Sequence, residues 1–150
     1  MALRQIRLFD DEILRKKCKV VEEVNDKIKL ILNDMAETMY NTENGGGLAA
    51  PQVGLLLRLV VVDMGEGLIK LVNPRIIDKE GTQEVIEGCL SIPNTWGKLI
   101  RPGKVTVKAL DENGEEFILT ATGELAKCLC HEIDHLDGIL FTDLVTEYIK

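Results

Sequence analysis

The sequence has 150 residues, a formal net charge of -7 and 45% hydrophobic residues. This length suits one compact domain, and we expect residues 1–150 to form it without disulfide bonds. The negative charge argues against direct nucleic-acid binding, which usually needs a basic face. Residues 1–11 lack the apolar run of a signal peptide, and no segment is long enough to cross a membrane. We therefore expect a cytoplasmic monomer with reduced cysteines.

The first predicted element is an amphipathic helix that begins at Asn25 and ends near Asn41. Its apolar residues recur at steps of three and four, with charged residues between them: Ile28, Ile31, Leu32, Met35 and Met39. This spacing is typical of a helix that packs on a core, so we interpret its methionines as core residues. Residues 44–54 follow, and their glycines and proline predict a shaped loop.

The middle of the chain predicts strands separated by turn signals, at residues 57–62, 68–72, 75–78, 83–86, 104–110 and 116–120. Asn113 and Gly114 mark a hairpin between the last two. A second helix is predicted from an N-cap at Thr122 to a stop at Gly138. The tail beyond it is short and is expected to pack back as a strand or a helical turn. This order indicates an α+β fold, with antiparallel sheets packed around the second helix.

The second predicted helix carries the two histidines of the chain, His131 and His135, with Glu132 between them. Side chains four residues apart lie on one face of a helix, so two imidazoles can bind one metal ion. Glu132 projects from nearly the same side and can reach a water on that ion. This H-E-x-x-H arrangement is typical of metal-assisted hydrolysis, although the same residues can also decorate an exposed helix.

A catalytic metal of this type needs a third protein ligand. One peptidase pattern would place a histidine at position 141, but the chain has Phe141 there. Carboxylates that follow the helix are disfavoured, because a further helix would have to turn back on the metal: Asp137, Asp143 and Glu147. The remaining candidate is Cys89, which follows a predicted strand and a glycine. A thiolate with two imidazoles is a sensible ligand set for a transition metal.

Three segments together resemble the signature motifs of the peptide deformylases, in the same order: residues 45–52, 87–91 and 131–135. The resemblance spans most of the chain. It implies an α+β domain in which sheets surround the metal-binding helix. It also implies a metal-dependent hydrolase that removes the formyl group from the N-terminal formylmethionine of new polypeptides and releases formate.

Carried over to matching positions, the resemblance implies one divalent ion bound by Cys89, His131 and His135. Fe(II) is the usual ion of the family, and the same ligands also suit zinc, nickel or cobalt. Glu132 is expected to act as the general base. The Gln52 side-chain amide and the Leu90 backbone N–H are expected to stabilise the developing oxyanion. For Gln52, a simpler interpretation is a loop residue that caps its own backbone.

The resemblance also implies where the substrate binds. Main-chain groups near Gly45, Gly46 and Gly47 would pair with a nascent N-formylmethionyl peptide as an added strand. Lys127 and Cys128, one helical turn before His131, are candidates for the wall of the methionine pocket. A transient contact with the ribosome suits such a substrate, although the acidic charge gives it no support.

Several residues near the motifs have two interpretations. Asp134 resembles a family residue that pairs with Arg101, but a solvated helix aspartate fits the sequence almost as well. Cys130 stands where the family often has glutamine. A zinc site made by Cys128, Cys130 and His131 is disfavoured, because ligands at that spacing on a helix point in different directions.

Two other functions are weighed against a deformylase: a zinc endopeptidase and a non-catalytic domain that binds a metal or a peptide. Phe141 and the segment around Cys89 disfavour the endopeptidase. A binding domain would need neither a base at Glu132 nor an oxyanion donor at Gln52, so these residues disfavour the second alternative.

Overall fold

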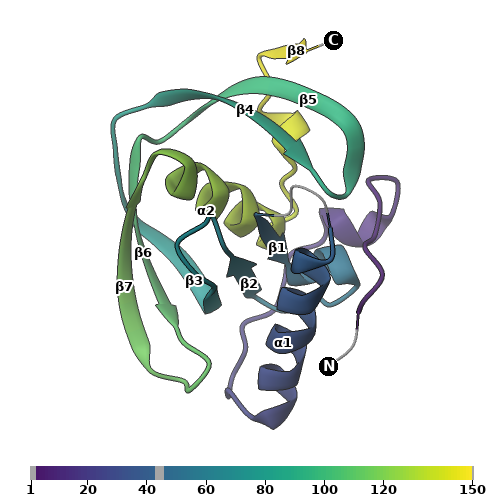
Figure 1. Cartoon of the computed structure of the whole chain (residues 1–150), viewed down its shortest axis with the longest axis vertical. Helices are drawn as coiled ribbons and strands as arrows, with labels where there is room; N and C mark the ends of the chain where they lie inside the picture. Colours follow the sequence, from purple (N-terminus) through teal and green to yellow (C-terminus); the bar gives the residue numbers. More distant parts are fainter. Residues whose placement is uncertain (1–2, 43–45, 150) are drawn as a thin grey trace.

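The computed structural model describes residues 3–42 and 46–149, in which two antiparallel sheets surround the helix α2 (Figure 1). This arrangement confirms the predicted α+β class. The helices and strands are α1 (Asp26–Tyr40), β1 (Gly47–Ala49), β2 (Leu59–Val62), β3 (Ile69–Glu80), β4 (Gln83–Cys89), β5 (Ile92–Arg101), β6 (Lys104–Leu110), β7 (Glu116–Thr122), α2 (Gly123–Leu136) and β8 (Glu147–Ile149). Short 3-10 turns lie at Glu12–Arg15, Ala50–Val53 and Phe141–Asp143.

The larger sheet has the order β1-β2-β3-β6-β7, and the smaller sheet has the order β4-β5-β8. Strands β1 and β4 therefore stand at the ends of their sheets, and both lie close to α2 (Figure 1). The apolar face of α2 packs on the larger sheet through a cluster that includes Ala126, Leu129, Ile133 and Leu136. Burial of this face holds α2 between the sheets, because apolar area removed from water stabilises the fold.

Helix α1 agrees with the sequence prediction in position and in packing. The side chain of Asn25 accepts a hydrogen bond from the Ile28 N–H and caps the first turn. Met35 and Met39 are fully buried in the cluster that joins α1 to β2, so they are core residues as predicted.

Helix α2 also begins and ends where the sequence indicated. Thr122 occupies the N-cap position, but its side chain makes no capping hydrogen bond. At the other end, Gly138 has a positive φ of 74°, and a Cβ there would lie 2.6 Å from the Arg15 carbonyl oxygen. A residue with a side chain would be strained and crowded at this position, which explains the glycine stop.

The strand predictions were partly wrong. Strand β5 was missed, because Pro93, Asn94 and Gly97 read as loop residues. The segments 68–72 and 75–78 form the single strand β3, which continues past Asn73 although that residue has a positive φ of 52°. The glycine-rich segment that was predicted to be a loop contains β1 and the 3-10 turn Ala50–Val53. The short tail does pack back, as a 3-10 turn and β8.

The four cysteines of the chain are all unpaired: Cys18, Cys89, Cys128 and Cys130. Burial raises the pKa of Cys18 and that of Cys130 to about 11, so both thiols are protonated at neutral pH. Neither helix in the described part of the chain is long and apolar enough to span a bilayer.

Candidate metal centre

His131 and His135 lie on the buried face of α2, and Cys89 reaches them from the end of β4. The two imidazole centroids are 5.0 Å apart. The Cys89 Sγ lies 3.4 Å from Nε2 of His135, and one ligand atom from each of the three residues falls within 4.8 Å of the others. A register shift between Glu87 and Cys89 ends the regular pairing of β4 with β5 just before this cysteine. The structure therefore brings together the three residues that the sequence nominated as ligands.

The donor set fits a transition-metal ion. Nδ1 of His131 faces the Glu87 carboxylate at 2.7 Å, which leaves Nε2 as the nitrogen available to a metal ion. A histidine ligand commonly has a carboxylate on its other nitrogen, because this contact sets the tautomer and the ring orientation. One sulfur and two imidazole nitrogens lie close together with little solvent around them. This set of ligands suits Fe(II), zinc, nickel or cobalt.

The two imidazoles of the cluster have different electrostatic surroundings. Burial disfavours the charged form of His131, but Glu132, Cys89 and Glu87 outweigh burial and raise its pKa above the ordinary value. Burial, followed by the charge of His131, lowers the pKa of His135. The two imidazoles therefore have pKa values shifted in opposite directions.

A buried ionic network supports His131. Arg101 donates through Nε and Nη2 to the two oxygens of Glu87, at 2.6 and 2.9 Å. Its Nη1 donates to Asp134 at 2.6 Å. Burial raises the pKa of Glu87, but the hydrogen bonds from Arg101 and His131 outweigh burial and lower it to about 2. Asp134 is thus a partner of Arg101 rather than a freely solvated residue.

Glu132 lies at the inner edge of the cluster. Its side chain is buried, and Oε1 has no hydrogen-bond partner among the residues that the structure describes. Burial raises its pKa to about 7. The carboxylate is placed to take up or release a proton beside the cluster, provided that a water or a substrate approaches it.

Gln52 caps its own backbone, one of the two interpretations that the sequence left open, and its amide also lies beside the cluster. Its Oε1 accepts the Ala49 N–H at 3.0 Å, which caps the backbone at the start of the 3-10 turn. Its Nε2 donates to the Ser91 hydroxyl at 3.2 Å and lies 3.6 Å from the Cys89 Sγ. The backbone bond thus holds the amide so that its N–H groups face the cluster.

The glycine-rich segment lies directly against α2. A Cβ on Gly47 would lie 2.8 Å from both the Cys128 Sγ and the Glu132 Oε2, so a glycine is needed for this close approach. The Cys128 thiol donates to the Gly46 carbonyl at 3.6 Å. Gly45 lies outside the described residues.

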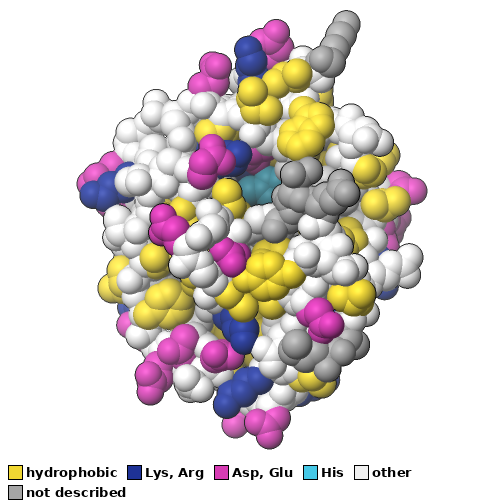
Figure 2. All heavy atoms as spheres, viewed as in Figure 1, with side chains coloured by type: hydrophobic (Ala, Val, Ile, Leu, Met, Phe, Trp, Pro, Cys, Tyr) yellow, Lys and Arg dark blue, Asp and Glu magenta, His cyan; other side chains and the backbone are white. Residues whose placement is uncertain are grey.

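The cluster opens into a cavity of about 480 Å³ between the ends of the two sheets. Figure 2 shows the histidine surface inside a hollow near the middle of this face. Four residues that the sequence analysis expected to bind substrate line the cavity: Gly46, Gly47, Lys127 and Cys128. Gln52, Leu90 and Glu132 line it as well.

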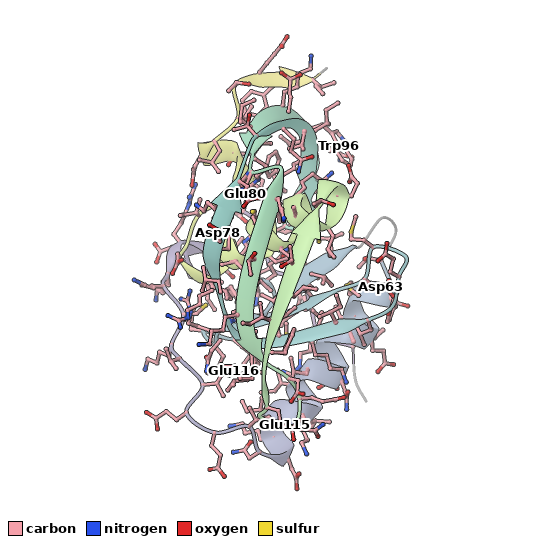
Figure 3. The ribbon with its side chains drawn as sticks, turned by 90° about the vertical axis from the view of Figure 1, so that its left-hand side faces the viewer. Asp63, Asp78, Glu80, Trp96, Glu115 and Glu116 are labelled. Carbon is pink, nitrogen blue, oxygen red and sulfur yellow. The ribbon has the colours of Figure 1, made fainter. Side chains whose placement is uncertain are left out.

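Other residues of the cavity were not found from the sequence: Met64, Ile86, Trp96 and Glu124. Figure 3 labels Trp96 and also Asp63, which precedes Met64 in the chain. Both labelled residues lie on the same side of the molecule in that view. The six-membered ring of Trp96 covers Gly88, where a Cβ would lie 2.6 Å from the ring. Trp96 is the only tryptophan of the chain, which was the one signal that the sequence offered. The structure shows that it is half-exposed.

The alternative ligands have other partners. Phe141, at the sequence position where the peptidase pattern has its third histidine, stacks on the His131 ring with centroids 6.0 Å apart. The remaining carboxylates form ion pairs with basic residues: Asp137 with Arg58, Asp143 with Arg15 and Glu147 with Lys98.

The sequence profile of the family described as polypeptide deformylase matches residues 3–149. The chain belongs to this family. Peptide deformylase 2 of Clostridium acetobutylicum is 71% identical over 150 residues, which cover all of both chains. The peptide deformylase of Caldicellulosiruptor bescii is 59% identical over the whole of this chain and 90% of its own length.

Solved deformylase structures have the same fold. The crystal structure of the Thermotoga maritima peptide deformylase superposes with a TM-score of 0.93 at 37% identity, covering 96% of this chain and 98% of the other. The Ehrlichia chaffeensis enzyme in complex with actinonin gives 0.94 at 37% identity, covering 97% and 90%. As a deformylase, the chain is a metal-dependent hydrolase.

Proposed function

We propose that this deformylase removes the formyl group from the N-terminal formylmethionine of newly made polypeptides, and that Cys89, His131 and His135 bind its metal ion. The observation that carries the proposal is the convergence of these three donors within 4.8 Å of one another, beside a cavity that Cys89 and His131 line. The reaction adds water across the formyl C–N bond and releases formate and a free amine.

One divalent ion is expected at this centre, and we propose Fe(II) as the native ion on the family resemblance. Such an ion polarises a carbonyl and lowers the pKa of water to about 7, which makes a nucleophile available at neutral pH. Glu87 and Arg101 would keep the His131 ring in the orientation and tautomer that binding requires.

Glu132 is the proposed general base. Its free Oε1 can accept the proton of the attacking water and pass it to the leaving amine nitrogen. The amine therefore departs neutral, and the carboxylate returns to its starting state. Buried surroundings favour this transfer because few waters compete for the carboxylate.

Gln52 and Leu90 are the proposed donors to the oxygen that becomes negative when water attacks the formyl carbon. The Gln52 amide is fixed in advance by the Ala49 N–H, so little reorganisation is required. Loss of one such donor typically costs roughly a hundredfold or more in rate. The Leu90 N–H directly follows Cys89 in the chain and lines the same cavity.

The peptide is proposed to bind between two strand ends. Strands β1 and β4 each have one open edge, and the cavity lies beside both of them. Backbone groups at such edges can pair with an extended peptide whatever its side chains. The methionine side chain would enter the cavity beside Cys128, with Lys127 at its wall and Gly46 and Gly47 on the facing strand.

The test is formate release from formyl-Met-Ala-Ser by enzyme loaded anaerobically with Fe(II) or Ni(II). Formate together with a free methionine amine is the expected result. Cleavage of internal peptide bonds would instead support a zinc endopeptidase, and intact substrate would support a non-catalytic binding domain. Metal analysis of the same samples identifies the ion that sustains turnover.

We further propose that the enzyme acts as a monomer in the cytoplasm and meets nascent chains during transient contact with the ribosome. The supporting observations are the unpaired cysteines and the substrate itself. Sedimentation velocity tests the monomer, and co-sedimentation with translating ribosomes tests the contact.

A further inference from the structure

The open edge of β4 exposes the backbone carbonyl of Ile86. Ile86 stands opposite Lys98 in the pairing of β4 with β5. The Lys98 carbonyl accepts the Thr146 N–H at 2.8 Å, on the β8 side of β5. In an antiparallel strand, the N–H and C=O of one residue point to the same side. Lys98 therefore does not bond to Ile86, and the polar backbone groups of Ile86 point to the open edge.

Lys127 already occupies this acceptor. Its Nζ donates to the Ile86 carbonyl at 3.2 Å and also forms an ion pair with Glu124 at 2.9 Å. The Lys127 side chain is only 20% exposed, and Glu124 is 69% exposed. Both residues line the cavity, where Figure 2 shows acidic and basic side chains beside the histidine surface. Lysines commonly protect open sheet edges in this way.

The position of this contact relative to a bound peptide follows from the strand direction. Strand β4 runs from Gln83 toward the candidate metal centre at Cys89. A peptide that pairs antiparallel with β4, and has its formyl end at the centre, extends from Cys89 back toward Gln83. It passes Gly88 first and reaches Ile86 only later in its length.

We infer that Lys127 ends the backbone pairing of a bound peptide before Ile86, so that only the first residues of the nascent chain are held. The inference rests on the proposed function. A peptide N–H would have to displace an ammonium group from the carbonyl, and a charge-assisted hydrogen bond is roughly twice as strong as a neutral one. The exchange is therefore unfavourable, and additional peptide length adds no backbone bond at this position.

The first experiment uses the unmodified enzyme and a series of formyl-Met pentapeptides, each with one N-methylated amide. Both kcat/KM for formate release and Kd for the corresponding deformylated peptides are measured. N-methylation of an amide near the methionine should lower kcat/KM and the affinity by about threefold or more, which corresponds to one hydrogen bond. N-methylation of a distal amide should lower them by less than about twofold. Strong sensitivity at a distal amide would show an open Ile86 carbonyl and overturn the inference.

The second experiment repeats the series with Lys127→Met, which keeps the aliphatic chain and removes the ammonium. In Lys127→Met, one further amide should become sensitive to N-methylation. The ratio of kcat/KM for pentapeptides to kcat/KM for dipeptides should be about three- to tenfold higher than in the unmodified enzyme. Lys108→Met is the matched control, since Lys108 also pairs with a glutamate, Glu116, but lies on the larger sheet. Identical patterns in Lys127→Met and the unmodified enzyme would overturn the inference.

The two readouts separate this inference from the proposed function. Absence of formate release by the unmodified enzyme would count against the proposed function. The Kd pattern would still report whether Lys127 limits pairing, because product peptides bind without being hydrolysed. Formate release with equal sensitivity along the whole peptide would overturn the inference alone.

Discussion

The Glu87 carboxylate contacts Nδ1 of His131 at 2.7 Å, and both of its oxygens accept hydrogen bonds from Arg101. The orientation of a candidate ligand on α2 therefore depends on a carboxylate from β4. A contact of this kind makes the ligand nitrogen more basic and fixes the ring.

Glu87→Gln should weaken metal binding by about 10- to 100-fold, because the amide is a poorer partner for the imidazole N–H. Chelator competition with the zinc-loaded or nickel-loaded protein measures the affinity. Glu84→Gln, on the same strand but exposed, is the control and should bind metal normally. Equal affinities for the two variants would remove Glu87 from the support of the centre.

Glu132→Gln should retain the metal and lose at least a hundredfold in kcat, because the amide has the shape of the carboxylate but cannot accept the proton. Formate release and metal content are measured on the same preparation. The control, Glu116→Gln, changes a glutamate that pairs with Lys108 at 3.3 Å on the β6–β7 hairpin. Normal turnover by Glu132→Gln would assign the base elsewhere.

Cys89→Ser should bind less metal and should change metal preference, because a hydroxyl is a poorer ligand than a thiolate for a soft ion. The cobalt-loaded protein provides the measurement, since its visible spectrum reports sulfur coordination. Cys18→Ala removes a buried thiol that packs in the core cluster around α2 and serves as the control. Identical cobalt spectra for Cys89→Ser and the unmodified protein would contradict the assignment.

Gly47→Ala should lower kcat at least tenfold with normal metal content, because the new methyl group would displace the Glu132 carboxylate from which it lies 2.8 Å. Steady-state kinetics and metal analysis test this. Gly103→Ala is the matched control, since its Cβ would meet its nearest neighbour, the Thr82 carbonyl oxygen, at 3.5 Å. An unchanged kcat for Gly47→Ala would mean that Glu132 tolerates the displacement.

Asp143→Asn should reduce the free energy of unfolding at pH 7 by about 0.5–1 kcal/mol, the usual value of an exposed ion pair. The hydrogen bond from Arg15 lowers the pKa of Asp143 below 3.8, so its contribution is present above that pH and disappears as the pH falls through the folded-state pKa. Urea unfolding at pH 7 and at a series of pH values below 3.8 should therefore show that the difference in unfolding free energy between Asp143→Asn and the unmodified protein narrows as the pH falls. The exposed Asp78→Asn is the control; a difference independent of pH would contradict the charge explanation.

Local chemistry alone determined much of this protein. The periodicity of α1, the histidine spacing on α2, the Gly138 stop and the strand 104–110 could all be predicted, because each depends on neighbours in the sequence. The three short motifs also indicated which residues would act together. These features depend on the spacing of residues along the chain, which can be read from the sequence alone.

Other features were decided only by tertiary structure. Strand β5 has loop-like residues and is extended because β4 and β8 pair with its two sides. Glu87 and Arg101 come to support the candidate metal centre only because β4 and β5 bring them to α2. The contact of Lys127 with Ile86 likewise depends on how a helix lies against a distant strand edge. Pairing and packing between segments far apart in the chain supply the free energy for these contacts, so no local pattern reveals them.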